Sequence, residues 1–402
     1  MAPVLIVAAT SARMLAESAR RGGLRPIALD LFGDVDTRRA ARWIGIGNRT
    51  RSAIDAQRLH SVITRLARQP QVRGWVVGGG FEDRLELLQD CARTLTLLGN
   101  EPAVIGFAKQ PADFFRILDR HGIEHPETSL VAPATSSGWL TKRVGGTGGW
   151  HVRRLETGHG RPEPHPSPAA MAVVQPTRLS RRAMRSQPVY FQREEGGTSM
   201  SALFLANGSE AIVVGCNLLR VGAVGERPFV FQGAVGPVAL PASADKAVRH
   251  AVACVTRHIG LRGLNSLDFL LDGARVSVIE VNPRPSATME LHDHRVPGGL
   301  LNAHLSACTA RTLPPEPSHP PSTVWGTQII YARRRLVTSR PCCQRLQSLG
   351  WCHDIGREGT RTARGDPLCS ISAEAASTDA AVEELTRRAR DIQSIYEEEN
   401  DH

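Results

Sequence analysis

The sequence predicts an α/β (α+β) fold in which a doubly wound parallel sheet is followed by strand-rich units. Three observations predict it: strands and helices alternate over the first hundred residues, a glycine-rich hairpin lies near residue 145, and short strands follow it. The 402 residues suffice to bury two or three cores, and 41% hydrophobic with 22% charged residues is ordinary for a globular chain.

The first hundred residues carry the parallel-sheet pattern. VLIVAAT (4–10) predicts a buried strand, SARMLAESARRGG (11–23) a helix closed by two glycines, and LRPIALDLF (24–32) the next strand. GWVVGGGFED (74–83) predicts another strand with a glycine-rich loop, followed by a helix to about residue 98. No GxGxxG sequence is present, so a dinucleotide fingerprint is not supported.

The loop after the strand at 74–77 is the first candidate for ligand contact. Parallel sheets bind ligands at the carboxyl ends of their strands. The residues concerned are Gly78, Gly79, Gly80 and Glu82. The alternative, that these glycines only turn the chain, is equally compatible with the sequence.

The rest of the chain reads as short elements separated by turns. The sequence predicts a helix at 111–122, strands at 188–194, 201–206 and 211–219, a helix at 244–259 and a β-rich stretch from 322 to 372. From residue 379 it predicts a charged helix that forms a solvated amphipathic cap. Residues 157–187 are rich in Pro, His and Arg and predict an exposed, mobile excursion. The expected units are 1–108 (α/β), 109–195 (a lid containing that excursion), 196–312 (metal and nucleotide site) and 313–402 (β-rich segment and helix).

Charge and composition indicate which classes of binding partner the chain is expected to have. The net charge is +10, but the chain has only three lysines, its arginines are spread along the sequence, and aromatic residues make up 5%. This favours a solvated arginine-rich surface over a nucleic-acid interface. The absence of a long apolar run predicts no membrane span. Eight scattered cysteines suit a reducing compartment, so a cytoplasmic location is expected; a metal cluster at Cys342, Cys343, Cys352 and His353 is disfavoured by its spacing.

The segment WLTKRVGGTGGWHV (139–152) is the first chemical motif. Two strand-like runs flank GGTGG, whose backbone can approach a ligand closely and offer several N–H donors to phosphate. Lys142 precedes the glycines, which is the reverse of the P-loop order. We expect a flexible lid over nucleotide phosphates; the alternative is a plain hairpin with a surface lysine.

The segment VIEVNPRPSATMEL (278–291) is the second motif. Asp268, Glu280 and Asn282 supply three oxygen ligands on neighbouring strands, which suits Mg²⁺. For Asp268 and Glu280 to share a face, the hairpin between them is expected to have a three-residue loop, since a two-residue Asp-Gly turn would send Glu280 to the other face. Arg284 would then project near the metal and hold a carboxylate or a transferring phosphoryl group. The alternative is a strand end with ordinary polar residues, which leaves Glu280 unexplained.

Lys142 before GGTGG, VYFQREEGG, Asp268 and EVNPR together resemble the ATP-grasp superfamily of carboxylate–amine ligases. The resemblance implies an ATP-grasp fold with an N-terminal doubly wound parallel α/β domain, a small glycine-loop lid domain and a C-terminal mixed-sheet ATP-binding domain. GGGFED, EVNPRPSATMEL and WCHDIGREGTRTARGDPLCSI further resemble the predicted carboligases of methanogens and methylotrophs, which include the tyramine–glutamate ligases of methanofuran and methylofuran synthesis.

The resemblance also implies roles for individual residues. Lys142 would contact phosphates and take part in catalysis, with Lys109 as a second nucleotide-contacting lysine. Arg284 would steady an acyl phosphate. The glycine lid would be Gly145, Gly146, Gly148 and Gly149; the adenine and ribose hinge Gln192, Arg193, Glu194 and Glu195; the metal ligands Asp268, Glu280 and Asn282.

The implied reaction is ATP-dependent, ADP-forming amide synthesis through an acyl phosphate, with Mg²⁺ or Mn²⁺ as the metal. Small acids and amines are the expected partners, in a homodimer without nucleic acid or membrane. The residues identify no base for the amine. A carboxylase, a phosphotransferase or a non-catalytic nucleotide-binding protein remain alternatives.

Overall fold

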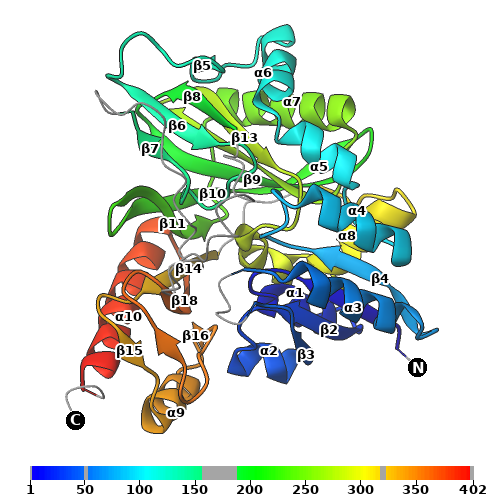
Figure 1. Cartoon of the computed structure of the whole chain (residues 1–402). Helices are drawn as coiled ribbons and strands as arrows, with labels where there is room; N and C mark the ends of the chain where they lie inside the picture. Colours follow the sequence, from blue (N-terminus) through cyan, green and yellow to red (C-terminus); the bar gives the residue numbers. More distant parts are fainter. Residues whose placement is uncertain (1, 49–52, 156–187, 317–322, 399–402) are drawn as a thin grey trace, which may run out of the picture.

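The computed structural model describes residues 2–48, 53–155, 188–316 and 323–398 (Figure 1). The chain forms an amino-terminal parallel sheet, a small sheet near the glycine loop, and one large antiparallel sheet. The excursion expected at 157–187 lies outside the described residues.

The amino-terminal sheet has the strand order β3-β2-β1-β4, and every pairing in it is parallel. Three of its strands were predicted from the sequence; β3, a half-buried edge strand, was not. The strands are β1 (Val4–Ala8), β2 (Arg25–Asp30), β3 (Arg42–Gly45) and β4 (Val72–Val77).

Helices cover both faces of this sheet, as the doubly wound prediction requires. Along β1, Ile6 packs with α3 and α4 on one face, and Leu5 and Val7 pack with α1 on the other. Near-continuous apolar runs are therefore needed in the central strands. The helices of this region are α1 (Arg13–Arg21), α2 (Val35–Ala40), α3 (Ala56–Ala67), α4 (Leu85–Thr94), α5 (Pro102–Ala108) and α6 (Pro111–Arg120).

The small sheet carries the glycine loop. Its order is β5-β8-β6-β7, and the loop connects β6 to β7, which pair in antiparallel fashion. The strands are β5 (Thr128–Ser129), β6 (Trp139–Arg143), β7 (Arg153–Arg154) and β8 (Val189–Arg193). The predicted glycine hairpin is thus confirmed as a structural element.

The large sheet has the order β13-β12-β9-β10-β11-β14-β18-β16. All its described pairings are antiparallel, where a mixed sheet was expected. Short turns explain the β9–β10, β10–β11 and β12–β13 pairings, because such turns can join only antiparallel neighbours. The other pairings join strands that are separated by further elements. The strands are β9 (Thr198–Asn207), β10 (Ala211–Val224), β11 (Arg227–Gly236), β12 (Arg262–Asp272), β13 (Arg275–Asn282), β14 (Val324–Tyr331), β16 (Cys352–His353) and β18 (Pro367–Ala375).

Helices also cover both faces of the large sheet. Alternate residues of β9 separate them: Phe204 packs with α7 (Ala242–Ile259), and Leu203 and Leu205 pack with α8 (Gly299–Thr309). At the other end of the sheet, α9 (Arg340–Ser348) and α10 (Thr378–Glu398) pack on β14 and β18. A separate two-stranded sheet consists of β15 (Leu336–Val337) and β17 (Arg361–Thr362).

The last helix is amphipathic, as predicted, and its apolar face is buried. Leu385, Ile392 and Tyr396 are buried in one core cluster with residues of β14 and β18. The charged residues of α10 form its opposite face, as in an amphipathic helix.

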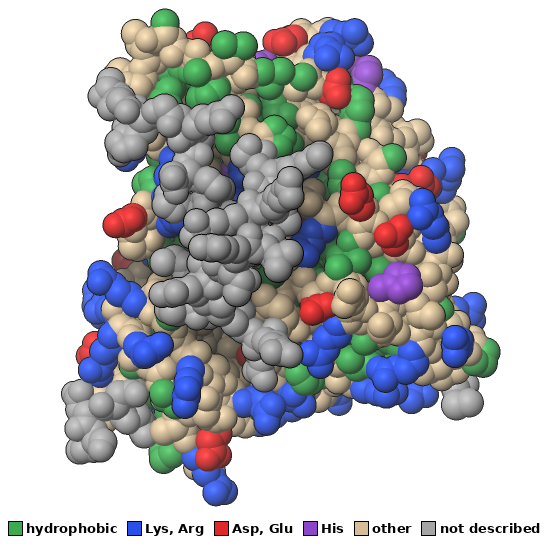
Figure 2. Space-filling view, in the orientation of Figure 1, with side chains coloured by type: hydrophobic (Ala, Val, Ile, Leu, Met, Phe, Trp, Pro, Cys, Tyr) green, Lys and Arg blue, Asp and Glu red, His purple; other side chains and the backbone are tan. Residues whose placement is uncertain are grey.

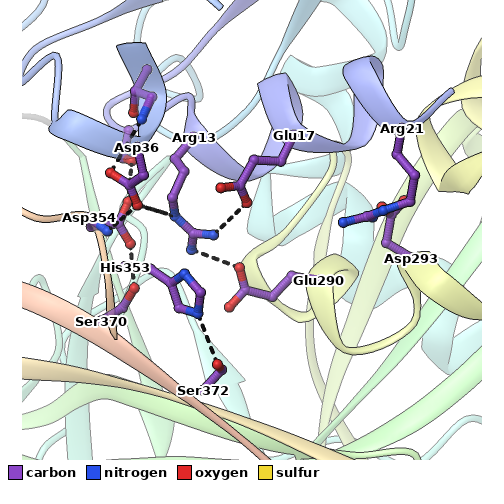
Figure 3. A network of polar contacts seen from close by, with 12 residues as sticks. Arg13, Glu17, Arg21, Asp36, Glu290, Asp293, His353, Asp354, Ser370 and Ser372 are labelled. Atoms are coloured by element: carbon purple, nitrogen blue, oxygen red, sulfur yellow. Dashed lines mark hydrogen bonds and ion pairs between the residues drawn. The ribbon is translucent and has the colours of Figure 1, made fainter. Parts of the chain in front are cut away.

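Three segments of the chain meet at Arg13, the first residue of α1 (Figure 3). Its guanidinium, in a side chain 7% exposed, forms ion pairs with Glu17 (2.9 Å), Glu290 (2.7 Å), Asp354 (3.0 Å) and Asp36 (3.6 Å). Glu290 follows the EVNPR motif, and Asp354 follows β16. Arg13 therefore joins the amino-terminal sheet to both later parts of the chain.

The surface shows no sorting of charge into one dominant patch in the view of Figure 2. Lys and Arg side chains are spread over the visible face and are interspersed with Asp and Glu. None of the described helices is both long and apolar enough to cross a membrane.

Candidate functional site

Asp268 and Glu280 lie directly opposite each other on β12 and β13. The turn between the strands has two residues, Gly273 and Ala274, since Asp272 pairs with Arg275. The three-residue loop expected from the sequence is therefore wrong. The carboxylates share a face for another reason: Phe269 pairs with Val278 and Asp268 with Glu280, so a β-bulge at Ile279 shifts the register by one.

Lys109 reaches this pair from the end of α5. Its Nζ donates to Glu280 Oε2 at 3.0 Å and to Asn282 Oδ1 at 2.9 Å. The Asn282 amide nitrogen in turn donates to Asp268 Oδ2 at 2.9 Å. One lysine and one amide thus connect both carboxylates.

The two carboxylates differ in protonation. Burial and the neighbouring charge of Glu280 raise the pKa of Asp268, against the opposing charges of Lys109 and Arg284. Burial acts on Glu280 in the same direction, but Lys109, Lys142 and His151 outweigh it and lower the pKa of Glu280. A single proton shared by the pair therefore resides on Asp268.

Lys142 is buried between the carboxylates and the predicted hinge. Its Nζ donates to Gln192 Oε1 at 2.6 Å, and on the β6–β8 ladder Lys142 is opposite Tyr190. Burial lowers the pKa of Lys142 to about 8, although Glu280 and Asp268 act in the opposite direction. Part of the Lys142 population is consequently neutral in mildly alkaline solution.

The glycine loop packs against β11 on one side and against the loop at Glu82 on the other. Phe231 N donates to Gly148 O at 3.0 Å, and the Trp150 ring meets Tyr331 edge-on with centroids 5.8 Å apart. Gly149, with φ of +75°, approaches β11 so closely that a Cβ there would lie 1.7 Å from Phe229 O. On the other side, a Cβ at Gly145 would lie 3.2 Å from Glu82 O.

The loop leaves little room below it in this position. The cavity beside Lys109, Gly146, His151 and Glu280 has a volume of about 20 Å³. That volume holds about one water molecule. A larger ligand at the carboxylates therefore requires the loop to lift.

The four predicted hinge residues do not all point to the site. Gln192 does, through Lys142. Arg193 donates to Ser137 O, and Glu194 pairs with Arg154 at 2.6 Å on the exposed side. Glu195 accepts from Ser277 Oγ at 2.9 Å.

Arg284 follows the carboxylate strand and contacts the loop at the end of β4. Its Nε forms a short ion pair with Glu82 Oε1, and both side chains are largely buried. Glu82 also accepts from the backbone N–H groups of Gly80 and Phe81, each at 2.9 Å. A Cβ at Gly79 would lie 3.5 Å from Arg284 Cζ, in ordinary van der Waals contact, so the guanidinium lies directly over this loop.

Comparison with known proteins identifies the architecture. Residues 112–288 match the family model described as an ATP-grasp domain. A biotin carboxylase from Campylobacter jejuni, solved with β,γ-ATP, superposes with a TM-score of 0.68 at 12% identity, over 94% of this chain and 89% of that one. The chain has the ATP-grasp fold.

Two further solved structures with this fold are similar over nearly the whole chain. The biotin carboxylase domain of a 2-oxoglutarate carboxylase from Hydrogenobacter thermophilus, solved with MgADP, ADP and bicarbonate, has a TM-score of 0.65 at 11% identity, covering 94% of this chain and 88% of that one. An L-amino acid ligase from Bacillus licheniformis has a TM-score of 0.64 at 15% identity, covering 97% of both chains. No curated protein sequence matches the chain.

The donor set formed by Asp268, Glu280 and Asn282 fits a magnesium ion. Asp268 and Glu280 are hard oxygen donors facing each other, and the raised pKa of Asp268 reflects a negative charge that a cation would relieve. In the described part of the chain, no group of three His, Cys, Asp or Glu side chains is placed to bind a metal. Mg²⁺ takes one or two carboxylates and completes its shell with water and phosphate oxygens.

The side-chain oxygen of Asn282 points to Lys109 and not to the two carboxylates. Its amide nitrogen faces the carboxylates and its oxygen accepts from Lys109. For the oxygen to bind a metal, the amide has to rotate and Lys109 has to release it, for example to a phosphate group.

His151 belongs to the same site and was not singled out from the sequence. It follows the glycine loop, and the charges that act on it are those of Glu280, Lys142, Lys109 and Arg143. Burial lowers the pKa of His151 to about 4, so the imidazole is neutral. The only sequence signal was its position two residues after the last predicted lid glycine.

Proposed function

We propose that this chain is an ATP-dependent, ADP-forming carboxylate–amine ligase. One observation carries the proposal: two opposed carboxylates, Asp268 and Glu280, are bridged by Lys109 and Asn282 beneath a glycine loop preceded by the buried Lys142. An acidic pair for a divalent ion beside two lysines for phosphates is a constellation for phosphoryl transfer.

Each charged group has a role in this proposal. Asp268, Glu280 and Asn282 hold Mg²⁺ or Mn²⁺, which when bound neutralises the charge that spreads over the phosphate oxygens. Lys109 and Lys142 orient the phosphates, and the glycine loop excludes water above them. The backbone of residues 192–195 would hold the adenine, and Glu194 or Glu195 would take the ribose hydroxyls on release from its present partner, Arg154 or Ser277.

Arg284 faces the acid substrate. The substrate carboxylate attacks the γ-phosphate, ADP leaves, and the resulting acyl phosphate is held by Arg284 once Glu82 shares the guanidinium with it. The amine then attacks the acyl carbon, phosphate leaves, and the amine releases a proton, which yields an amide. Specific binding of the acyl phosphate keeps it from hydrolysis.

The substrate pair we propose is L-glutamate and tyramine, as in methanofuran or methylofuran biosynthesis, in a cytoplasmic homodimer. The support is the likeness of GGGFED, EVNPRPSATMEL and WCHDIGREGTRTARGDPLCSI to that group of ligases. An L-amino acid ligase is among the similar structures, in keeping with an amide-forming ligation.

The testing experiment is an omission series. Purified protein is incubated with Mg-ATP, L-glutamate and tyramine, each left out in turn, while ADP, phosphate and new masses are measured. ADP, phosphate and a glutamyl-tyramine mass that appear only in the complete mixture are the expected result. ATP binding without turnover in any arm rejects the pair and directs a screen of other acids and amines.

A carboxylase is the second candidate, because two of the similar structures are biotin carboxylases. The same series therefore includes an arm with bicarbonate. ADP formation that needs bicarbonate and consumes no amine would replace the ligase by a carboxylase.

A further inference from the structure

The imidazole of His151 has an unused hydrogen-bonding atom inside the site. Its Nδ1 is fully buried and has no hydrogen-bond partner among the described residues. Leaving a buried polar atom without a partner costs about 1–3 kcal/mol. Such an atom next to a binding cavity indicates a partner that arrives with the ligand.

Gly146 shows that the ring is held in place by the loop. A Cβ at Gly146 would lie 2.2 Å from His151 Cγ and 2.5 Å from its Nδ1. Unlike Gly145, Gly148 and Gly149, Gly146 does not have a positive φ. A side chain at position 146 is therefore excluded because it would overlap the imidazole, and not because of the backbone conformation.

The surroundings of the ring select an anionic partner. Lys142, Lys109 and Arg143 act on His151 as positive charges, against the single carboxylate of Glu280. His151, Lys109, Arg143 and Glu280 line the same small cavity under the loop. An N–H donor among three cations fits a phosphate oxygen better than it fits a substrate ammonium.

The position of the His151 ring indicates which phosphate group of ATP it would contact. Glu280 is the charged group that acts most strongly on His151, and Glu280 is the proposed metal carboxylate. Asp268 and Glu280 would hold a magnesium ion that neutralises charge on the terminal phosphates, whereas Lys142 and Gln192 lead away toward the hinge. The ring thus lies at the γ-phosphate end of the site.

We infer that His151 is a catalytic residue that donates a hydrogen bond from Nδ1–H to the γ-phosphoryl group of ATP when the glycine loop closes. This inference rests on the proposed function, since it needs a nucleotide at Asp268 and Glu280. It adds to the backbone donors of the loop a side chain that distinguishes ATP from ADP.

Calorimetry of Mg-ATP and Mg-ADP binding, without acid or amine, tests the inference. The variant H151A is expected to bind ATP about tenfold or more weakly and ADP almost as well as the parent protein. Asn carries a polar atom near the position of Nδ1 and Gln one near Nε2, so H151N restores ATP affinity and H151Q does not. Equal losses for ATP and ADP, no loss, or rescue by Gln but not Asn each overturn it.

A double-mutant cycle with Gly146 gives a second readout. The variant G146A displaces the ring and is expected to weaken ATP binding as much as H151A does. In the H151A background, G146A is expected to have no further effect, because its clash partner is gone. Additive losses would show that Gly146 and His151 act separately and would contradict the inference.

The outcomes also separate this inference from the proposed function. If the parent protein binds neither ATP nor ADP, both the proposed function and the role of His151 are overturned. If the parent protein binds ATP and the His151 variants bind it equally well, only the role of His151 is overturned. Thermal melting of H151A, H151N and G146A identifies any variant that loses affinity by failing to fold.

Discussion

Asp268 and Glu280 face each other because Ile279 is an extra residue in the β12–β13 ladder. Without this bulge, the register that pairs Phe269 with Val278 would place Ile279 opposite Asp268 and turn Glu280 to the other face. A single unpaired residue therefore creates a two-carboxylate site from a hairpin that would otherwise separate the carboxylates.

The two carboxylates are expected to respond in opposite ways to amide substitution. Asp268→Asn removes a buried charge whose pKa is raised, so it is expected to keep or increase the free energy of unfolding. Glu280→Gln leaves Lys109 without its charged partner and is expected to lower the free energy of unfolding. Both variants are expected to lose about 100-fold or more in kcat/KM. Urea unfolding and steady-state kinetics measure the two effects; equal stability changes of the same sign would contradict the assignment.

Burial of Lys142 is expected to make stability rise with pH in mildly alkaline solution. Its folded pKa of about 8 lies below the ordinary value of 10.5, so the folded protein loses this proton first. Between those pH values the unfolded chain binds more protons, and the free energy of unfolding increases. Lys142→Met is expected to abolish this rise, to stabilise the protein at pH 7 by about 1–3 kcal/mol and to abolish activity.

Lys246 provides the control for that measurement, because it is exposed on α7. Lys246→Met is expected to leave both the pH profile of unfolding and the activity unchanged. A rise with pH that survives in Lys142→Met would assign the titration to another group.

Docking of the glycine loop on β11 is expected to depend on Gly149. An alanine there combines a positive φ with a Cβ 1.7 Å from Phe229 O, so the loop cannot pack against β11. Gly149→Ala is expected to raise KM for ATP about tenfold or more with little change in Tm, because the loss is confined to the loop. Gly196→Ala is the matched control, since a Cβ at Gly196 meets nothing within 4 Å and its φ is not positive. Similar kinetic effects in both variants would reject a docking role.

The Arg284–Glu82 pair is expected to couple two loops strongly. Removing Arg284 leaves the carboxylate of Glu82 buried with a side chain 3% exposed, and Arg284→Ala is expected to cost about 3–5 kcal/mol of unfolding free energy. Burial would raise the pKa of Glu82, but Arg284 keeps it below the ordinary 4.5. This contribution is complete above pH 4.5 and is lost as pH falls through the lower folded value.

Chemical denaturation of Arg284→Ala, Glu82→Gln and the double variant between pH 3 and 7 checks this pair. The double variant is expected to be more stable than Arg284→Ala, since it leaves no unpaired buried charge. Simple addition of the two single effects would contradict the coupling.

The sequence predicted the elements that depend on local pattern. The apolar runs of β1 and β4 and the amphipathic repeat of α6 have a period that neighbouring residues determine. It also brought Lys109, Lys142, Asp268, Glu280 and Asn282 into one proposed site, and the structure places them together.

The errors concern features that depend on distant contacts. A β-bulge at Ile279 has no local signal, because Ile suits a regular strand equally well. The half-buried edge strand β3 lacks the apolar run of a central strand. The importance of His151 became visible only when its ring was found against Gly146 and beside Glu280.

The ion pairs of Arg13 bear on how much of the chain is needed for folding. The family model matches residues 112–288 only, yet Glu290 and Asp354, which hold Arg13, both lie beyond that segment. Strands β14 and β18 extend the sheet that carries Asp268 and Glu280, and they also lie outside it. An excised 112–288 fragment would present an open sheet edge to other copies of itself. The cooperative unit is therefore larger than the recognisable domain, and expression trials should retain all three segments that meet at Arg13.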